Sequence, residues 1–149
     1  MRITPVYRDV LLSLEAAGLG SPLWPAFYHM AYLPHRAYFD GLADTYGPLL
    51  MGHGGLPGIV TRLAPALRRA LQSAPGYRME ERVRSLMERL QPLLPGRVPH
   101  VWLATLFFAA PAATVAVGGR PEIALGMERF SPAPPPVPDG LRSRNHTAA

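Results

Sequence analysis

Histidine is the residue of this chain best suited to bind a metal or to transfer a proton near neutral pH. A zinc site built on one helix needs two histidines four residues apart, as in His-Glu-x-x-His, and the sequence does not contain this pattern. His29 and His35 are six residues apart, a spacing that does not put both on one face of a helix. The sequence therefore predicts no metal-binding residue. The five histidines are His29, His35, His53, His100 and His146.

His53 lies in a glycine-rich stretch, residues 52–55, just before an expected helix. The first amide groups of a helix can hold an anion. An exposed loop without a ligand explains the same residues more simply, so we assign His53 no ligand.

Paired carboxylates are the second pattern that can carry acid–base chemistry. Glu80 and Glu81 are neighbours that project about 100° apart on a helix, which indicates solvated charges. Glu80 also precedes Arg84 by four residues, the spacing of a helical ion pair. Glu122 and Glu128 are six apart and share one face if both belong to one strand, where a solvent-facing edge accounts for them.

Other catalytic patterns are missing from the sequence. It contains no cysteine, and all 15 basic residues are arginine, so that thiolate and lysine chemistry are excluded. It has no Gly-x-Ser-x-Gly motif, no phosphate-binding loop and no dinucleotide fingerprint. We therefore expect no catalytic residue, no cofactor-binding residue and no cofactor.

The net charge is +5, and residues 62–97 carry eight arginines against three glutamates. Such a basic segment attracts anionic partners. Aromatic residues do not alternate with the arginines, as binding to single-stranded nucleic acid requires, so nucleic acid is not an expected partner. The first residues lack the apolar core of a signal peptide. We predict a bacterial cytoplasmic protein whose partner is another protein or a second copy of the chain.

The elements expected to position these residues are helical up to residue 94. Apolar residues recur at intervals of three and four within 6–17, 21–32, 35–46, 57–71 and 77–94. The aromatic residues of the second range are expected to pack in the core: Trp24, Phe27, Tyr28 and Tyr32. In the last range the expected buried row is Val83, Leu86, Met87, Leu90 and Leu94.

The most β-prone part of the chain runs from Val98 to Phe130. Residues 98–108, 114–117 and 122–127 are expected to form two or three strands, with a turn at Gly118-Gly119. Five prolines between 132 and 138 predict a disordered tail over 131–149. The predicted fold is α+β: N-terminal helices packed on a small β-hairpin or meander in one domain, 1–130, followed by the proline-rich tail.

Val101 to Gly118 is a run of 18 residues without a charge, which is long enough for a membrane-spanning helix. Pro111 in the middle of the run and Gly118-Gly119 at its end favour a buried hairpin. A membrane is therefore not an expected partner.

Three short motifs follow one another between residues 77 and 130. They are Leu93-Leu94-Pro95 after a helix, Val101 and Trp102 in a strand, and Ile-Ala-Leu-Gly-Met-Glu at 123–128 after a turn. This order resembles the region upstream of the active site in a family of predicted zinc-dependent proteases related to the gliding-motility lipoprotein B group. The resemblance implies a sheet whose edge strand aligns substrate. It also implies a following helix with His-Glu-x-x-His, where this chain instead has a proline-rich run.

The sequence thus leads to three hypotheses of function. The first is a truncated or degenerate zinc-peptidase-like scaffold without catalytic activity of its own. The second is a small basic, non-catalytic interaction protein, which binds an acidic partner through arginine-bearing helices at 58–94 or pairs by the edge of its β-hairpin. The third, ranked last, is a protein anchored to a membrane through residues 101–118.

Overall fold

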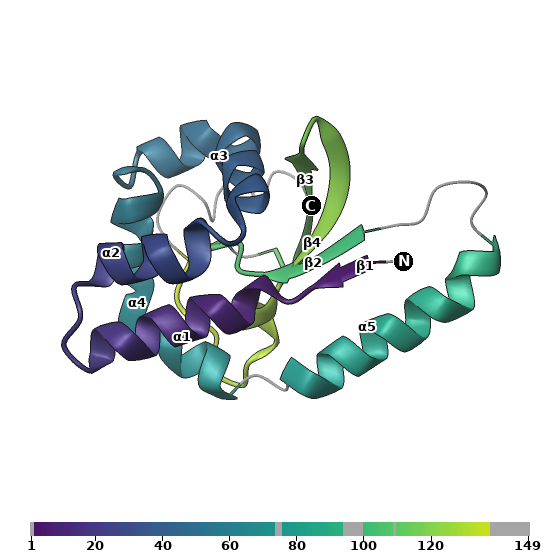
Figure 1. Cartoon of the computed structure of the whole chain (residues 1–149), viewed down its shortest axis with the longest axis horizontal. Coiled ribbons are helices and arrows are strands. Elements are labelled where there is room, and N and C mark those ends of the chain that lie inside the picture. Colours follow the sequence, from purple (N-terminus) through teal and green to yellow (C-terminus); the bar gives the residue numbers. More distant parts are fainter. Residues whose placement is uncertain (1, 74–75, 94–99, 109, 138–149) are drawn as a thin grey trace.

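A computed structural model of the chain describes residues 2–73, 76–93, 100–108 and 110–137. The described elements confirm the predicted α+β class (Figure 1). The helices are α1 (Val6–Gly18), α2 (Leu23–Phe27), α3 (Arg36–Met51), α4 (Gly55–Ser73) and α5 (Gly76–Leu90). The strands are β1 (Arg2–Thr4), β2 (His100–Ala104), β3 (Ala112–Val117) and β4 (Arg120–Gly126). A π-helical turn (Tyr28–Tyr32) and two 3-10 turns (Gln91–Leu93 and Met127–Phe130) complete the described secondary structure.

The four strands form one mixed sheet in the order β1-β2-β4-β3. β1 and β4 both pair with β2 in parallel, and β3 pairs with β4 in antiparallel fashion at one edge. Gly118 and Gly119 have positive φ angles of 58° and 79°, as the two-residue turn of a hairpin requires. The predicted hairpin is confirmed. The parallel pairing of β2 differs from a meander, and β1 is too short to show the alternation that indicates a strand.

Residues 101–118 belong mainly to two strands of this sheet, β2 and β3, with a loop between them. Among the described residues, no helix is both long and apolar enough to cross a membrane. The hypothesis of a membrane-spanning helix at 101–118 is therefore wrong.

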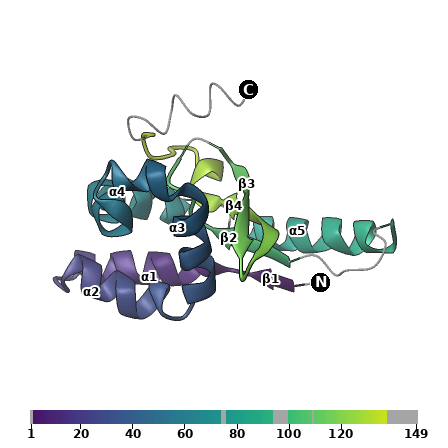
Figure 2. The ribbon, with the colours of Figure 1, turned by 90° about the horizontal axis from the view of Figure 1, so that it is seen from above.

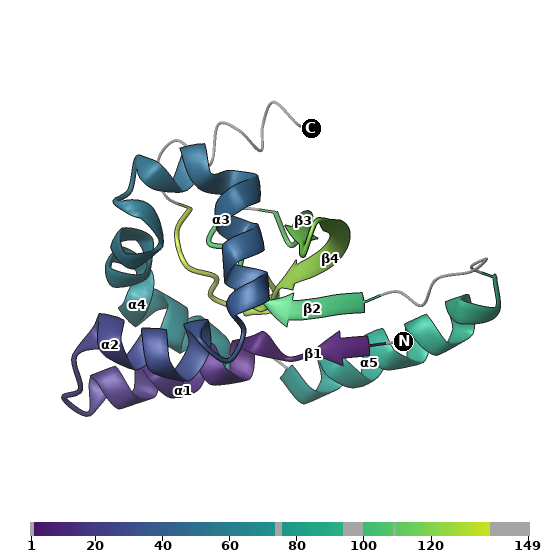
Figure 3. The same ribbon diagram turned by 45° about the horizontal axis from the view of Figure 1, so that its top comes forward.

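Helices α1 to α4 pack together beside the sheet, whereas α5 extends away from them alongside β1 (Figures 1 and 2). α3 crosses the sheet near the end of β2 and lies against β3 (Figure 3). The apolar row predicted for α4 is confirmed, because every member of it is buried. These residues are Ile59, Val60, Leu63, Leu67, Ala70 and Leu71.

The stretch between the helices expected at 35–46 and 57–71 is largely helical in the structure. α3 extends to Met51 and α4 begins at Gly55. Tyr46 has a non-helical backbone (φ −120°, ψ 18°), so α3 is kinked there. Pro48 thus falls in the first turn of the second segment of α3, where its missing N–H group leaves no hydrogen bond unmade.

Packed structure continues beyond Phe130. Ser131 and Pro135 are buried, and the Arg129 guanidinium donates a hydrogen bond to the Pro135 carbonyl at 2.7 Å. Of the predicted disordered tail, residues 138–149 lie outside the described residues.

Glu128 is fully buried in the 3-10 turn after β4. Its Oε2 atom accepts hydrogen bonds from the amides of Leu106, at 3.1 Å, and Phe107, at 3.0 Å. Phe107 has a positive φ of 63°, which aromatic residues rarely adopt. The carboxylate thus stabilises a strained loop between β2 and β3. Its Oε1 atom has no hydrogen-bond partner among the described residues.

Burial raises the pKa of Glu128 above its ordinary value of 4.5. The shift is opposed by hydrogen bonds from the backbone amides of Phe107, Glu128 itself and Leu106, and by the positive charge of Arg129. A raised pKa in the folded state means that this group stabilises the protein fully at pH below about 4.5. This contribution is then lost as pH rises through the raised value.

We predict that two substitutions of Glu128 change the free energy of unfolding in different ways. Glu128→Leu removes the acceptor of two buried amides and should lower the free energy of unfolding by about 2–4 kcal/mol. Glu128→Gln keeps a neutral acceptor, so its stability relative to wild type should increase as pH rises from about 4.5 to 8. Urea unfolding at several pH values measures both effects. A Gln variant that loses stability relative to wild type with rising pH would contradict the assignment.

Candidate functional site

Polar side chains from three neighbouring strands meet on one face of the sheet, at the carboxyl end of β1 and within the first three residues of β2 and β4. Thr4 comes from β1, His100 and Trp102 from β2, and Glu122 from β4. Thr4 Oγ1 lies 2.8 Å from His100 Nε2. The Trp102 indole N–H donates to Glu122 Oε1 at 2.9 Å, and the His100 ring stacks on Trp102 with centroids 4.1 Å apart. This group, the His100 cluster, is the candidate site.

The His100 cluster is largely closed to solvent, since the side chains of His100 and Glu122 are only 9% and 12% exposed. Burial lowers the pKa of His100 below its ordinary value of 6.5. The negative charge of Glu122 opposes this shift and the positive charge of Arg2 adds to it. The imidazole is therefore neutral at pH 7. The Thr4 hydroxyl and His100 Nε2 form a hydrogen bond in which the tautomer of the imidazole decides which group donates.

A hydroxyl, an imidazole and a carboxylate in this order are the groups of a catalytic triad. In a triad the carboxylate holds the imidazole through a hydrogen bond. Here His100 Nδ1 and Glu122 Oε2 are 3.7 Å apart, which is too far for a hydrogen bond. The other oxygen of Glu122 is bound by Trp102 instead. We therefore interpret the His100 cluster as a clamp that joins β1 and β4 to β2.

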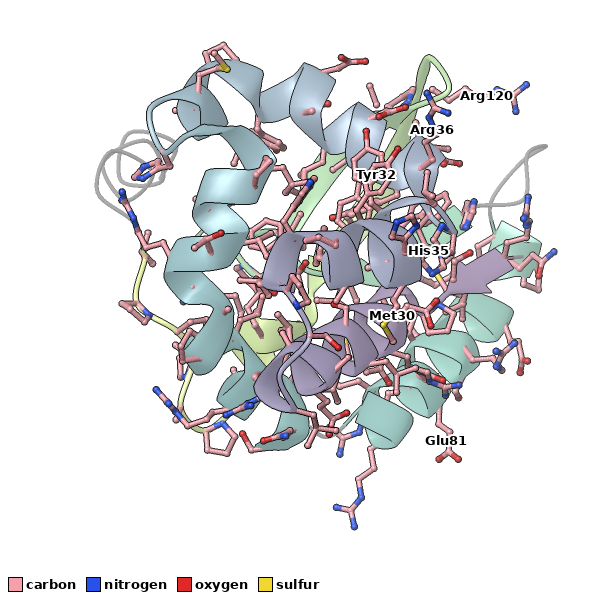
Figure 4. All side chains as sticks on the ribbon, turned by 60° about the vertical axis from the view of Figure 1, so that its left-hand side comes forward. Met30, Tyr32, His35, Arg36, Glu81 and Arg120 are labelled. Atoms are coloured by element: carbon pink, nitrogen blue, oxygen red, sulfur yellow. The ribbon has the colours of Figure 1, made fainter. Side chains whose placement is uncertain are left out.

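The other described histidines do not join this cluster. His35 pairs with Asp9 at 2.6 Å and lies near Tyr32 and Arg36 (Figure 4). His53 Nδ1 lies 2.8 Å from an Arg62 nitrogen, and His29 is exposed. No group of three or more histidine, aspartate or glutamate residues in the described part of the chain is arranged to hold a metal ion. His146 lies outside the described residues.

Two predictions about glutamates are wrong. Glu80 does not form the expected ion pair with Arg84; it accepts a hydrogen bond from Tyr7 at 2.7 Å and pairs with Arg8 at 2.5 Å. Glu122 and Glu128 do not share a strand face, because β4 ends at Gly126 and Glu128 turns into the core. Glu81 points from α5 into solvent, as predicted (Figure 4).

The predicted core packing of the aromatic residues is confirmed for Phe27, which is buried, whereas Trp24, Tyr28 and Tyr32 are half-buried. Trp24 has its ring centroid 5.6 Å from that of Phe27, 6.1 Å from that of Tyr28 and 6.4 Å from that of Tyr32. The rings of Tyr28 and Tyr32 stack at 5.4 Å. Rings this close pack against one another and leave no room for a ligand between them.

The outer edge of β3 is covered by α3. The amide of Ala116 donates to Thr45 Oγ1 at 3.1 Å, and the Tyr46 hydroxyl lies 3.4 Å from the Thr114 carbonyl. Gly41 packs so closely that an added Cβ atom would lie 1.9 Å from the Ala116 carbonyl oxygen. These contacts occupy the edge at residues 114–116, where an added strand would have to pair.

α5 is the helix in which the burial of apolar residues differs most from the prediction. Met87 is buried and Val83 is half-buried, as predicted. Leu86 and Leu90, which are expected in the same row, are 52% and 38% exposed, and Leu93 just beyond the helix is 76% exposed. Leu94 lies outside the described residues. The sequence pattern identifies an apolar face but does not show that only part of it meets the domain.

A shallow hollow lies between α1, α2 and α4. Leu14, Leu23, Ala64 and Pro65 line it with apolar surface, and Arg68 lies at its side. The hollow is open to solvent, and none of its lining residues belongs to the His100 cluster.

A comparison of the chain with protein-family models, with curated proteins and with solved structures finds no match in any of the three.

The charges around His100 predict how its pKa responds to two matched substitutions. Glu122→Gln removes the negative charge that raises the pKa, so the pKa should fall further. Arg2→Gln removes a positive charge, so the pKa should rise. NMR titration of the His100 ring measures both shifts, and shifts of the same sign in the two variants would contradict the arrangement.

His100 should also make stability depend on pH. A folded-state pKa below 6.5 stabilises the protein above about pH 6.5, and this stability is lost as pH falls through the lower pKa of the folded state.

Proposed function

We propose that this chain is a non-catalytic scaffold with the sheet layout of a zinc-dependent peptidase. The observation that carries the proposal is the order of the strands after α5. Of the residues that resemble the peptidase family, Val101 and Trp102 lie in β2, and Ile123 to Gly126 lie in β4. These two strands are parallel neighbours, and the chain between them forms an antiparallel strand at the sheet edge. Because α3 covers the outer edge of the antiparallel strand at residues 114–116, the proposed scaffold does not align an extended segment along that edge.

Two observations support the absence of catalysis in this proposal. The sequence has no His-Glu-x-x-His, and the described residues offer no group of three metal ligands. The described residues that follow Phe130, Ser131 to Val137, form no helix. They therefore supply neither a metal-bound water nor a general base in the way that such peptidases do.

The scaffold proposal predicts that the purified chain does not retain zinc. After incubation with zinc and extensive dialysis, elemental analysis should give well under one equivalent per chain, and labelled casein should not be cleaved with or without added zinc. Retention of one equivalent of zinc, or cleavage that a chelator abolishes, would refute the proposal. His35→Asn and His100→Asn variants, measured in parallel, would then locate the ligands.

A second candidate function is the binding of an acidic partner protein. The observation in its favour is the number of arginines on α4 and α5 that are exposed and make no ion pair with another described residue. They include Arg69, Arg78, Arg82, Arg84 and Arg89. Unpaired positive charges on adjacent helices attract an anionic surface, and salt weakens this attraction.

The second function predicts salt-dependent binding to an acidic polypeptide. Labelled poly-L-glutamate should bind the full chain at low salt and bind about tenfold or more weakly near 0.3 M salt, because counterions screen the charges. Poly-L-lysine serves as the control and should not bind. If poly-L-glutamate fails to bind at low salt, the second function is refuted.

A further inference from the structure

α5 presents an exposed row of leucines that no described residue covers fully. Leu86 and Leu90 are four residues apart on one side of α5, and Leu93 ends the 3-10 turn that directly follows the helix. Their side chains are 52%, 38% and 76% exposed. Elsewhere in the described chain, the exposed large apolar residues are isolated from one another along the sequence. The exception is α1, where Leu12 is exposed within the helix and Leu19 is exposed directly after it. With respect to the described residues, Leu86, Leu90 and Leu93 therefore form an unpartnered apolar surface at the end of the chain's projecting helix, α5 (Figure 2).

A row of arginines lies directly beside these leucines. Arg82 precedes Leu86 by four residues, and Arg89 precedes Leu93 by four. Arg82 therefore lies one helical turn before Leu86 and is its neighbour on the surface of α5, and Arg89 lies in the last turn of α5 before Leu93. Arg78 continues this row by one more turn. All three arginines are exposed and form no hydrogen bond or ion pair with another described residue. We call these three leucines and three arginines the Leu–Arg surface.

The other flank of the leucine row faces the domain. Val83 and Met87 are packed against the core, and Glu80 ties the start of α5 to Tyr7 and Arg8 of α1. Positive charge thus borders the leucines on one side only. A partner must bring apolar side chains to the leucines and negative charge to the arginine side.

A second copy of the chain does not meet this requirement. If two α5 helices pack antiparallel about a two-fold axis, the same flank of each helix meets its equivalent. The arginine row of one copy would then lie opposite the arginine row of the other. Like charges opposite each other are repulsive, so self-pairing on this surface is disfavoured.

A lipid membrane also matches the Leu–Arg surface less well than a helix of a partner protein does. A helix that lies in a membrane interface needs a polar, basic border on both sides of its apolar strip. Here one border is the domain itself. In contrast, leucines spaced by four and three residues match the spacing at which one helix packs beside another.

We propose that the Leu–Arg surface of α5 binds an acidic amphipathic helix of another protein. The leucines of α5 pack between apolar residues of the partner, and glutamates or aspartates along one flank of the partner pair with Arg78, Arg82 and Arg89. This inference rests on the second proposed function and names the surface and the partner chemistry for it.

The test uses the full chain and two synthetic helical peptides. The acidic peptide has leucines at alternating intervals of three and four residues and glutamates along one flank; the basic peptide has lysines in place of the glutamates. Fluorescence anisotropy measures binding. The wild-type chain should bind the acidic peptide and not the basic one, and salt should weaken the complex.

Charge-reversal variants locate the surface. Arg82→Glu/Arg89→Glu should weaken binding of the acidic peptide about tenfold or more and gain binding of the basic peptide. The matched control is Arg36→Glu/Arg120→Glu, which changes the net charge equally at exposed positions of α3 and β4, away from α5, and should bind the acidic peptide about as well as wild type. Leu86→Ser/Leu93→Ser should also weaken binding. All these positions are exposed, and thermal unfolding checks that each variant folds.

Several outcomes would overturn the inference. One is equal loss of binding in the control and in the α5 charge-reversal variant. Others are binding to vesicles of phosphatidylglycerol and phosphatidylcholine but not to the peptide, or a wild-type dimer in sedimentation that Leu86→Ser/Leu93→Ser dissociates. If poly-L-glutamate binds but the α5 variants bind the acidic peptide like wild type, the inference fails and the second function survives. If neither acidic probe binds, both fail.

Discussion

The buried carboxylate of Glu128 is the interaction on which much of the sheet depends. It accepts two amide hydrogen bonds from a loop whose backbone at Phe107 is strained, and so stabilises the path from β2 to β3. The same loop provides the Thr105 carbonyl that the hydroxyl of fully buried Tyr38 binds at 2.9 Å, which attaches α3 to the sheet. α3 then covers the outer edge of β3. One buried carboxyl group therefore connects the loop, a helix and the sheet edge, although desolvation makes its ionised form unfavourable.

Most residues whose chemistry makes them candidates for catalysis are used to join elements of the fold. His100 joins β1 to β2, His35 joins α3 to α1, and Glu80 joins α5 to α1. A polar side chain that is buried needs a partner, and in these cases the partner is another side chain of the chain itself. Among the described residues, the exposed groups include arginines of α4 and α5, the leucines at positions 86, 90 and 93, and carboxylates such as Glu81 and Glu88.

α5 differs from the other helices in how it is attached. α1 to α4 bury apolar residues against one another and against the sheet, whereas α5 contributes Met87 as its fully packed apolar residue and is joined to α1 through Glu80. A helix with a wide apolar face usually buries all of it. On α5 the domain covers one side of that face, and the remaining side stays next to a row of arginines. One part of the apolar face of α5 thus packs against the core, and the other part is exposed at the surface.

Local patterns in the sequence determined the helices, the buried row of α4 and the hairpin turn at Gly118-Gly119. These features depend on residues close together in the chain: apolar spacing, glycine with positive φ, and proline in a first helical turn. Only the tertiary structure decided which strands pair, because β1 and β2 are almost a hundred residues apart and β1 is three residues long. It also decided that Glu128 is buried and that Leu86 is exposed. Burial depends on what the rest of the chain places against a side chain, and no local pattern contains that information.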